Sequence, residues 1–229
     1  MQRRSLKAEQ LPFLVLIVCL QGVTTGLGWA MAAPSLAQPS AQWLPESSAL
    51  DVIEGNRPLA AWSRDGQRCF EYPKYTVIEK TGVSLDALLI SVMPATVRCR
   101  QFDQQRGIKP VFEVHNDAEL FAGLVGNILV TDTGSGPDGR VLSLYDVVSR
   151  SKLRQFPDFY GPVQLKDKTK LFFWLTSARA TPQNCSGYGQ RALQHLGSAI
   201  ETQVFMDLVH HKLHKTNNVR CNARQVPLR

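Results

Sequence analysis

The sequence lacks an apolar run as long as the roughly 20 residues that a membrane-spanning helix needs. Its main apolar segment, Leu11–Val23, is short and interrupted. Basic residues precede it, and small residues follow it, with small-x-small sequences at Ala30–Ala32 and Ser35–Ala37. This order is typical of an export signal. It predicts a signal peptide over residues 1–37 and no stable transmembrane segment after cleavage, and the alternative is a retained N-terminal anchor.

Cysteine is scarce, with five in the chain. Cys19 lies in the predicted signal peptide, which leaves Cys69, Cys99, Cys185 and Cys221 in the mature protein. The absence of any Cys-x-x-Cys spacing disfavours the alternative of a four-cysteine zinc site. Four cysteines in an exported chain predict two disulfides, with three possible connectivities. Loops of modest length favour the pairs Cys69–Cys99 and Cys185–Cys221.

Acidic residues are in the minority, with 19 Asp and Glu against 26 Lys and Arg. Residues 210–229 contain none. The basic residues of this segment are Lys212, Lys215, Arg220, Arg224 and Arg229. They predict contact with an anionic envelope component, such as lipopolysaccharide, phospholipid headgroups or an acidic glycan, and the alternative is a solvated strand face and tail. Nucleic acid is not an expected partner, because no aromatic-interleaved basic motif occurs and the chain is predicted to be periplasmic or secreted.

Long segments with helical periodicity are missing as well. From Cys69 onwards the apolar residues recur mainly with a period of two, and clusters of turn-forming residues separate the short apolar segments. This pattern predicts a mainly β fold. We expect a single antiparallel domain over residues 49–229, meander or sandwich-like, with one or two short helices and two disulfide staples. Residues 38–48, rich in Pro, Ser, Gln and Ala, are predicted to be a disordered leader.

Individual elements follow from the same periodicity. The expected strands cover residues 70–80, 107–114, 127–131, 140–148, 152–156, 160–165, 170–176 and 200–208. Leu85–Val97 fits either a strand or a short helix. Asp117–Val125 predicts a short helix, because Asp117 can cap it and apolar residues follow at helical spacing. A helical turn is expected over residues 191–196, and a chain reversal is expected at Thr216–Asn218.

No nucleophile elbow, phosphate loop or dinucleotide fingerprint is present. The sharpest catalytic candidate is Asp132-Thr133-Gly134-Ser135, which follows three apolar residues. It resembles the active-site turn of the aspartic peptidases, in which an Asp on a tight turn shares a proton with a second Asp. The chain has no second Asp-Thr-Gly, so this resemblance implies a homodimer with Asp132 as the catalytic residue. The alternative is a Gly-rich hairpin loop in which Asp132 bonds to its own backbone.

The same turn offers calcium ligands in Asp132, Ser135 and Asp138, but Gly134 and Gly136 occupy the alternating positions where ligands are needed. A second group of metal-ligand residues follows at the basic end of the chain.

His210, His211 and His214 lie where the upstream alternation predicts a strand. Four residues of a strand span about 13 Å, which is too far for one ion. We therefore expect no metal site and no cofactor.

The aromatic residues Trp62, Tyr145, Phe172, Phe173 and Trp174 could line a glycan groove. At strand spacing such residues more often belong to a core. The sequence predicts export and two disulfides, and it contains no complete set of catalytic residues. The sequence therefore predicts a non-enzymatic binding or structural module of the periplasm or cell envelope, with the peptidase and the envelope-surface binder as alternatives.

Overall fold

The computed structural model describes residues 44–45, 53–81, 88–105, 107–116, 119–133, 140–193 and 196–225. They belong to one compact unit, Ser40–Arg229. The predicted signal peptide lies outside the described residues, and of the predicted leader only Leu44–Pro45 is described, as a short strand. None of the helices in this described part of the chain is long and apolar enough to cross a membrane.

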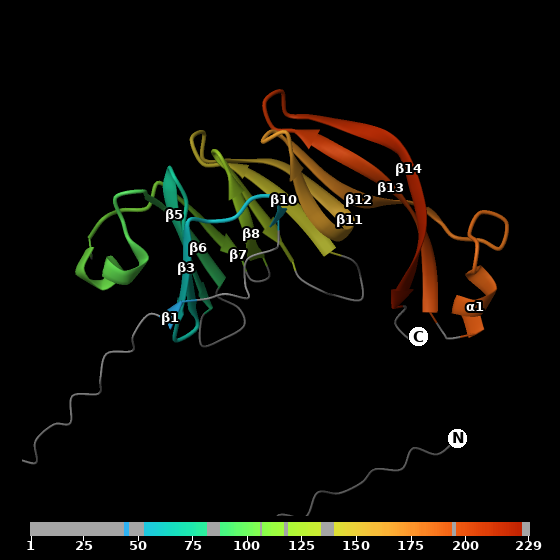
Figure 1. Ribbon diagram of the computed structural model, residues 1–229, viewed down its shortest axis with the longest axis horizontal. Coiled ribbons are helices and arrows are strands. Elements are labelled where there is room, and N and C mark those ends of the chain that lie inside the picture. Colours follow the sequence, from blue (N-terminus) through green and yellow to red (C-terminus); the bar gives the residue numbers. More distant parts are fainter. Residues whose placement is uncertain are drawn as a thin grey trace, which may run out of the picture. The chain divides into compact units, whose positions relative to one another are not determined.

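The fold is mainly β and antiparallel, as the sequence predicts, and the strands form two sheets (Figure 1). The first sheet has the order β1-β3-β4-β5-β6-β7. Its strands are β1 (Leu44–Pro45), β3 (Ala60–Arg64), β4 (Gln67–Glu71), β5 (Tyr75–Thr81), β6 (Leu88–Pro94) and β7 (Phe112–Asn116). A short 3-10 helix, η1 (Cys99–Gln105), lies in the connection from β6 to β7.

The second sheet has the order β14-β13-β12-β11-β10-β9-β8, and a short strand, β2, runs parallel to β11. Its strands are β2 (Ile53–Glu54), β8 (Leu120–Val125), β9 (Ile128–Asp132), β10 (Arg140–Asp146), β11 (Ser151–Lys166), β12 (Lys170–Arg179), β13 (Leu196–Asp207) and β14 (Lys212–Gln225). The helix α1 (Tyr188–Leu193) lies in the connection from β12 to β13.

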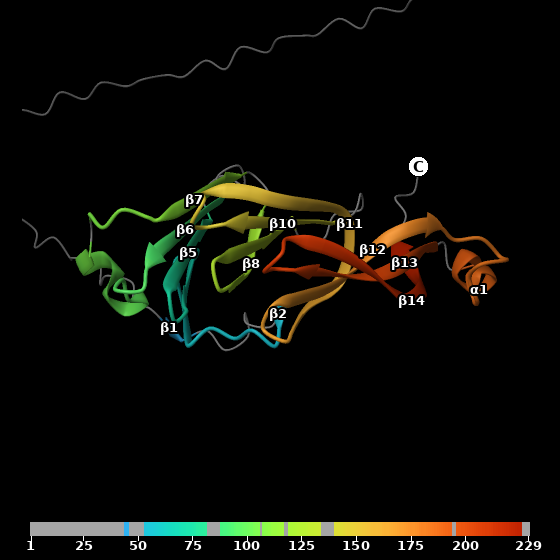
Figure 2. The same ribbon diagram turned by 90° about the horizontal axis from the view of Figure 1, so that it is seen from above.

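This second sheet folds back on itself along β11, a strand of 16 residues. Up to Phe159 the strand pairs with β10, and from Phe159 onwards it pairs with β12 (Figure 2). Pro157 and the positive φ angles of Asp158 and Gly161 mark the bend. Beyond Phe159, where β11 no longer pairs with β10, β2 pairs with this edge of β11 instead, with Ile53 opposite Val163. The sequence predicts two separate strands here, and the structure has one bent strand.

Strands β8–β10 form a middle layer with both faces buried. One face packs against the first sheet in a contact that we call the sandwich core. Its buried residues are Ala61, Phe70, Tyr72, Val77, Ile90, Val92, Val114, Phe121, Leu124, Leu129, Tyr145 and Val147. The other face packs against β2 and β11–β13 in the fold-back core. Its buried residues are Ile53, Ala122, Val125, Ile128, Val130, Leu142, Leu144, Phe156, Phe159, Val163, Leu171, Phe173, Val204 and Met206.

The prediction of a helix over Asp117–Val125 is wrong. The described part of this segment contains β8 instead. Phe121 and Leu124 belong to the sandwich core, whereas Ala122 and Val125 belong to the fold-back core. Because both faces of the strand are buried, apolar residues occupy consecutive positions, and some of them fall at helical spacing.

The last hairpin turns earlier than the sequence predicts. β13 ends at Asp207, residues 208–211 form the turn, and β14 begins at Lys212. Thr216–Asn218 lies within β14, where an irregularity in the pairing opposite Gln203 takes up the extra residues. The segment that fitted either a strand or a helix contains β6.

Two disulfides staple the fold with the pairing that the sequence favours. Cys69 of β4 is bonded to Cys99 at the start of η1, and Cys185 is bonded to Cys221 of β14. The first pair is completely buried on the outward face of the first sheet, which is the face turned away from the sandwich core. It therefore ties the β6–β7 connection to the middle of that sheet.

We predict that Gly123→Ala destabilises the middle layer. A Cβ atom at Gly123 would lie 2.5 Å from Cδ1 and 2.9 Å from Cγ1 of Ile53, a buried residue of β2. Overpacking of this kind typically costs about 1–3 kcal/mol. Urea unfolding should show this loss, and Ile53→Ala should cost less in the Gly123→Ala background than in the wild type. Strictly additive losses would contradict the proposed contact.

Candidate functional site

Asp132, the catalytic residue implied by the peptidase resemblance, lies buried at the end of β9. Both of its carboxylate oxygens accept hydrogen bonds from the guanidinium of Arg140 on β10, and the distance from Nε to Oδ1 is 3.1 Å. The guanidinium also lies 4.8 Å from the ring centroid of Phe159. This ion pair joins neighbouring strands, and it engages the carboxylate that a peptidase would share with a second Asp.

The rest of the turn, including Gly134, Ser135 and Asp138, lies outside the described residues. The calcium hypothesis therefore stays untested. The homodimeric peptidase also stays a prediction, now with the added condition that Asp132 would have to leave Arg140.

The three histidines lie on two different elements. His210 and His211 are in the β13–β14 turn, and His214 is on β14. The Nδ1 atom of His210 lies 2.8 Å from Oδ2 of Asp207, while the ring of His214 stacks on Phe205 with the centroids 4.7 Å apart. Within the described ranges, no group of three or more His, Cys, Asp or Glu residues could hold a metal ion.

The five aromatic residues suggested for a glycan groove do not come together. Tyr145 lies in the sandwich core and Phe173 in the fold-back core. Trp62 is half-buried on the first sheet, whereas Phe172 and Trp174 are half-buried on β12, each beneath a basic side chain. These residues therefore stabilise separate parts of the fold.

The basic C-terminal segment offers less free charge than its composition suggests. Nε of Arg220 lies 2.6 Å from Oε2 of Glu201, a fully buried carboxylate. Lys212 and Lys215 are exposed on β14, whereas Arg229 and the side chain of Arg224 lie outside the description. Contact with an anionic envelope component stays a prediction, and it depends mainly on the two lysines.

A buried carboxylate that sequence patterns did not reveal lies just before β8. Oε2 of Glu119 accepts hydrogen bonds from Thr131 (2.6 Å) and Tyr145 (2.7 Å), and Oε1 accepts from Ser143 (3.1 Å) and Lys152 (3.3 Å). Burial alone would raise the pKa of this carboxyl. The hydrogen bonds from Thr131 and Tyr145 and the charge of Lys152 outweigh burial, so the pKa is lowered.

A second buried carboxylate joins the two sheets. Glu79 of β5 forms an ion pair with Arg68 of β4 and accepts a hydrogen bond of 2.8 Å from the backbone N–H of Phe121 on β8. β8 is the edge strand of the second sheet, so this backbone group needs a partner from outside the sheet. Glu79 and Glu119 therefore satisfy groups of the middle layer, and we assign them structural roles.

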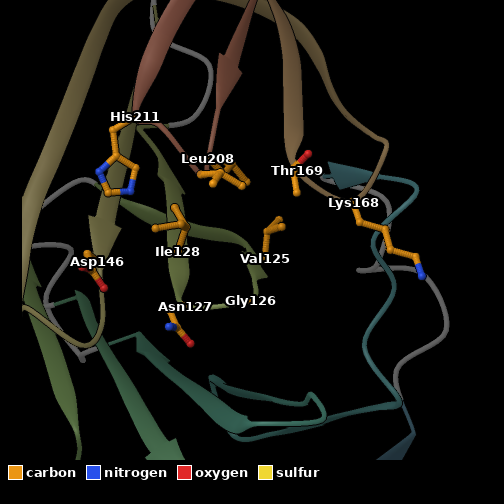
Figure 3. A pocket seen from close by; sticks show the side chains of 10 residues that line it. Val125, Gly126, Asn127, Ile128, Asp146, Lys168, Thr169, Leu208 and His211 are labelled. Carbon is orange, nitrogen blue, oxygen red and sulfur yellow. The ribbon is translucent and has the colours of Figure 1, made fainter.

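Three cavities lined by described residues are candidate ligand sites, and the third, of about 310 Å³, is lined by Asn56, Arg57, Leu59, Tyr72, Pro73, Lys74, Leu124 and Gly126. The first, the hairpin pocket, has a volume of about 260 Å³. It is lined by Val125, Gly126, Asn127, Ile128, Asp146, Lys168, Thr169, Leu208, Val209 and His211. Figure 3 shows Asp146 and His211 on one side of it and Lys168 on the other. Its volume is below the roughly 300–1,000 Å³ that is common for small-molecule sites.

The second cavity, the flap pocket, has a volume of about 470 Å³, which is within that range. It lies between the outward face of the first sheet and the flap, which is the β6–β7 connection described at residues 95–105 and 107–111. The sheet contributes Arg64, Gln67, Lys80, Leu89, Ser91, Met93 and Glu113. The flap contributes Phe102, Asp103, Gln105, Gly107, Ile108 and Pro110.

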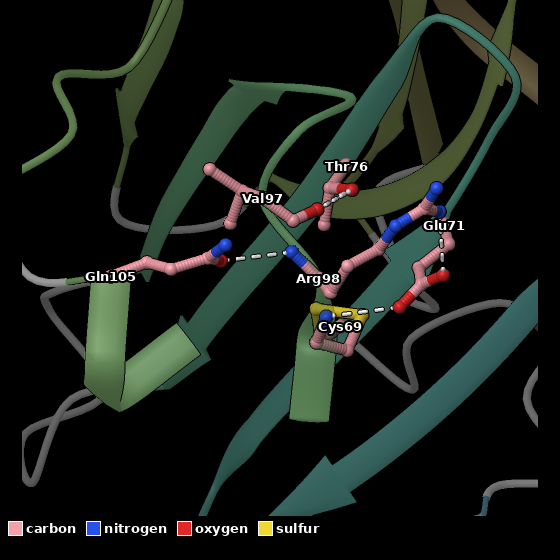
Figure 4. The surroundings of a disulfide bond; sticks show 7 residues. Cys69, Glu71, Thr76, Val97, Arg98 and Gln105 are labelled. Carbon is pink, nitrogen blue, oxygen red and sulfur yellow. Dashed lines mark hydrogen bonds and ion pairs between the residues drawn. A yellow bond between two sulfur atoms is a disulfide. The ribbon is translucent and has the colours of Figure 1, made fainter. Parts of the chain in front are cut away.

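The flap is anchored to the sheet at several points (Figure 4). The Cys69–Cys99 disulfide fixes the flap at the start of η1. The carboxylate of Glu71 accepts a hydrogen bond of 3.0 Å from the backbone N–H of Cys99, and the hydroxyl of Thr76 donates one of 2.7 Å to the carbonyl of Val97. The walls of the pocket are therefore formed before any ligand arrives.

Two polar groups of this pocket are uncommitted, which means that they form no ion pair or hydrogen bond with the described residues. Nζ of Lys80 lies 5.4 Å from the ring centroid of Phe102, and no carboxylate of the described residues forms an ion pair with it. Oε1 of Gln67 is buried and accepts no hydrogen bond from the described residues. By contrast, the hydroxyl of Ser91 donates a hydrogen bond of 2.9 Å to Glu113.

The chain matches no protein-family model, and comparison with curated proteins and with solved structures finds no significant match. The candidate function therefore depends on the geometry of the chain's own residues. The flap pocket had no signal in the sequence, because its polar residues come from five strands, β3 to β7, and from η1, and only the pairing of the strands and the position of the flap bring them together.

We predict that Glu119 makes stability depend on acidic pH. Because its folded pKa is lowered, its stabilisation is fully present above the ordinary pKa of 4.5 and is lost as the pH falls through the folded value. Glu119→Gln should lower the unfolding free energy at pH 7 by about 2 kcal/mol and flatten its acid dependence. Urea unfolding between pH 7 and pH 3 measures both effects, with exposed Glu54→Gln as the control. An unchanged acid dependence in Glu119→Gln would contradict this role.

We predict that Asp132→Asn lowers the unfolding free energy by about 2 kcal/mol, because Arg140 loses its charged partner. The exposed turn residue Asp65 provides the control variant, Asp65→Asn, which should change stability little. Thermal unfolding measures the difference. A homodimer that digests denatured protein at acidic pH, and loses this activity in Asp132→Asn, would instead support the peptidase.

Proposed function

We propose that this chain is an exported, non-enzymatic binding module and that the flap pocket is its ligand site. The observation that carries the proposal is a cavity of ligand size between two walls that a disulfide fixes in place. A preformed site binds with a smaller loss of conformational entropy than a site that must order on binding. The two disulfides suit an oxidising compartment outside the cytoplasm.

The chemistry of the pocket favours binding over catalysis. The hydroxyl of Ser91 donates to Oε1 of Glu113, and Nε2 of His115 lies 3.6 Å from Oε2 of the same carboxylate. A hydrolytic triad needs the histidine between the nucleophile and the acid, so that the imidazole can take the hydroxyl proton. Here the carboxylate lies in the middle, and the serine has no imidazole as its base.

Three small fragments test the location of the site: benzoate, benzamide and benzylamine. We expect at least one of them to shift the NMR signals of Leu89, Met93 and Ile108, because these apolar side chains line the flap pocket. Leu89→Trp, which fills the cavity, should abolish the shifts. Val219→Trp, at an exposed position of β14, should leave them unchanged.

The same spectra show whether each variant is folded. Shifts confined to the hairpin pocket, at Val125, Ile128 and Leu208, would move the site there. The absence of shifts at any cavity for all three fragments would contradict a small-molecule binding function.

A further inference from the structure

The uncommitted groups of the flap pocket are direct neighbours. Gln67 on β4 pairs with Lys80 on β5, and Lys80 pairs with Leu89 on β6. Side chains of directly paired residues lie on the same face, with their Cβ atoms about 5 Å apart. A hydrogen-bond acceptor, a cation and an apolar surface therefore follow one another across three adjacent strands.

Lys80 is a cation of the pocket that no carboxylate of the described residues pairs with. Its side chain is half-buried, and its ammonium group lies against the ring of Phe102 on the flap. The other cation of this row, Arg64, is held by the carboxylate of Asp103, with 3.1 Å from Nη2 to Oδ1. Lys80 is therefore the group that can bind an anion inside the pocket.

Gln67 requires a donor. A buried amide oxygen without a hydrogen bond is unfavourable, and a rotation of the half-buried Gln67 side chain would let this oxygen accept an N–H or O–H from a ligand in the cavity. The ligand must therefore present a donor close to its anionic group. A plain alkyl carboxylate has no such donor, and an organic ammonium ion would be repelled by Lys80.

The remaining lining is partly polar, because it includes Gln105, the carboxylate of Asp103, which is paired with Arg64, and that of Glu113, which accepts a hydrogen bond from Ser91. The other side chains of the lining are apolar. Leu89 and Met93 come from β6, and Phe102 and Ile108 come from the flap. These four side chains can enclose an apolar substituent of the ligand. The pocket therefore favours a small ligand that carries three groups: an anion, a hydrogen-bond donor next to it and an apolar substituent.

We propose that the flap pocket binds the C-terminal unit of an N-acylated apolar amino acid, either free or as the end of a short peptide. Its carboxylate pairs with Lys80, its amide N–H donates to Oε1 of Gln67, and its side chain lies among the apolar walls. The N–H and the carboxylate of such a unit are attached to one α-carbon, which matches two directly paired residues. This inference rests on the proposed function of the pocket.

Three probes test the two polar contacts separately in NMR titrations of the disulfide-bonded protein. N-acetyl-L-phenylalanine has both groups, N-acetyl-L-phenylalanine amide lacks the charge, and 3-phenylpropanoate lacks the N–H. We expect the first to bind about 10-fold more tightly than the amide, because it forms a charge-assisted contact. It should also bind about 5-fold more tightly than 3-phenylpropanoate.

Variants assign each preference to its residue. Lys80→Met should abolish the preference for the acid over the amide, and Gln67→Leu should abolish the preference for N-acetyl-L-phenylalanine over 3-phenylpropanoate. Lys109→Met is the matched control, because Lys109 is an exposed flap residue outside the pocket lining, and it should keep both ratios. Ratios of affinities are compared within each variant, so a general loss of affinity does not imitate the result.

Equal affinity of the acid and the amide in the wild type would overturn the inference. So would retention of both preferences in Lys80→Met and Gln67→Leu. If the probes bind in the flap pocket without these preferences, the proposed function stands and only the ligand class fails. If no probe shifts the pocket signals, the proposed function fails as well. Glycyl-glycyl-L-phenylalanine then separates the two sources, since tighter binding than the acetyl compound supports a peptide and equal binding supports a free acyl amino acid.

Discussion

The burial of β8–β10 on both faces is the constraint on which the rest of the structure depends. A strand between two cores can carry polar groups only where the protein itself satisfies them, because water is excluded from both sides. The polar groups of this layer meet that requirement within the chain. Glu119 collects four donors, Glu79 accepts the edge N–H of Phe121, and Asp132 is paired with Arg140. Asp132, the carboxylate that looked most catalytic in the sequence, therefore also links two neighbouring strands of this layer.

The outward face of the first sheet is in the opposite situation. Only a small cluster covers it, formed mainly by Ile78, Met93, Val97 and the Cys69–Cys99 disulfide. By the chain-entropy model, a disulfide that closes a loop of this length contributes roughly 3 kcal/mol, so it supports a flap whose own core is small. A covalent anchor also allows the flap to stand clear of the sheet over part of its length. The flap pocket is the space that results.

The pattern of period two was enough to predict the fold class and most strands, because in a strand such as β13 Val204 and Met206 lie in a core while Gln203 and Asp207 lie on the other face. It failed at β8, where burial of both faces removes the alternation. It also missed the last turn, in which His211 adopts a positive φ angle although it is not a glycine. The cysteine pairing could be predicted from loop lengths. The flap pocket could not, because Gln67 and Lys80 become neighbours only through the pairing of β4 with β5.

The two uncommitted groups of the flap pocket also bear on why a binding site is the better interpretation. A buried amide oxygen without a donor disfavours the folded state by about 1–3 kcal/mol, and the half-buried ammonium of Lys80 has no carboxylate partner among the described residues. Buried carboxylates elsewhere in the protein, such as Glu79, Glu119 and Glu201, each form an ion pair. Polar groups that lack a partner, in a protein whose other buried polar groups have one, are expected at functional sites. A ligand that supplies both missing partners would recover this free energy on binding, and it would stabilise the folded protein in proportion to its concentration.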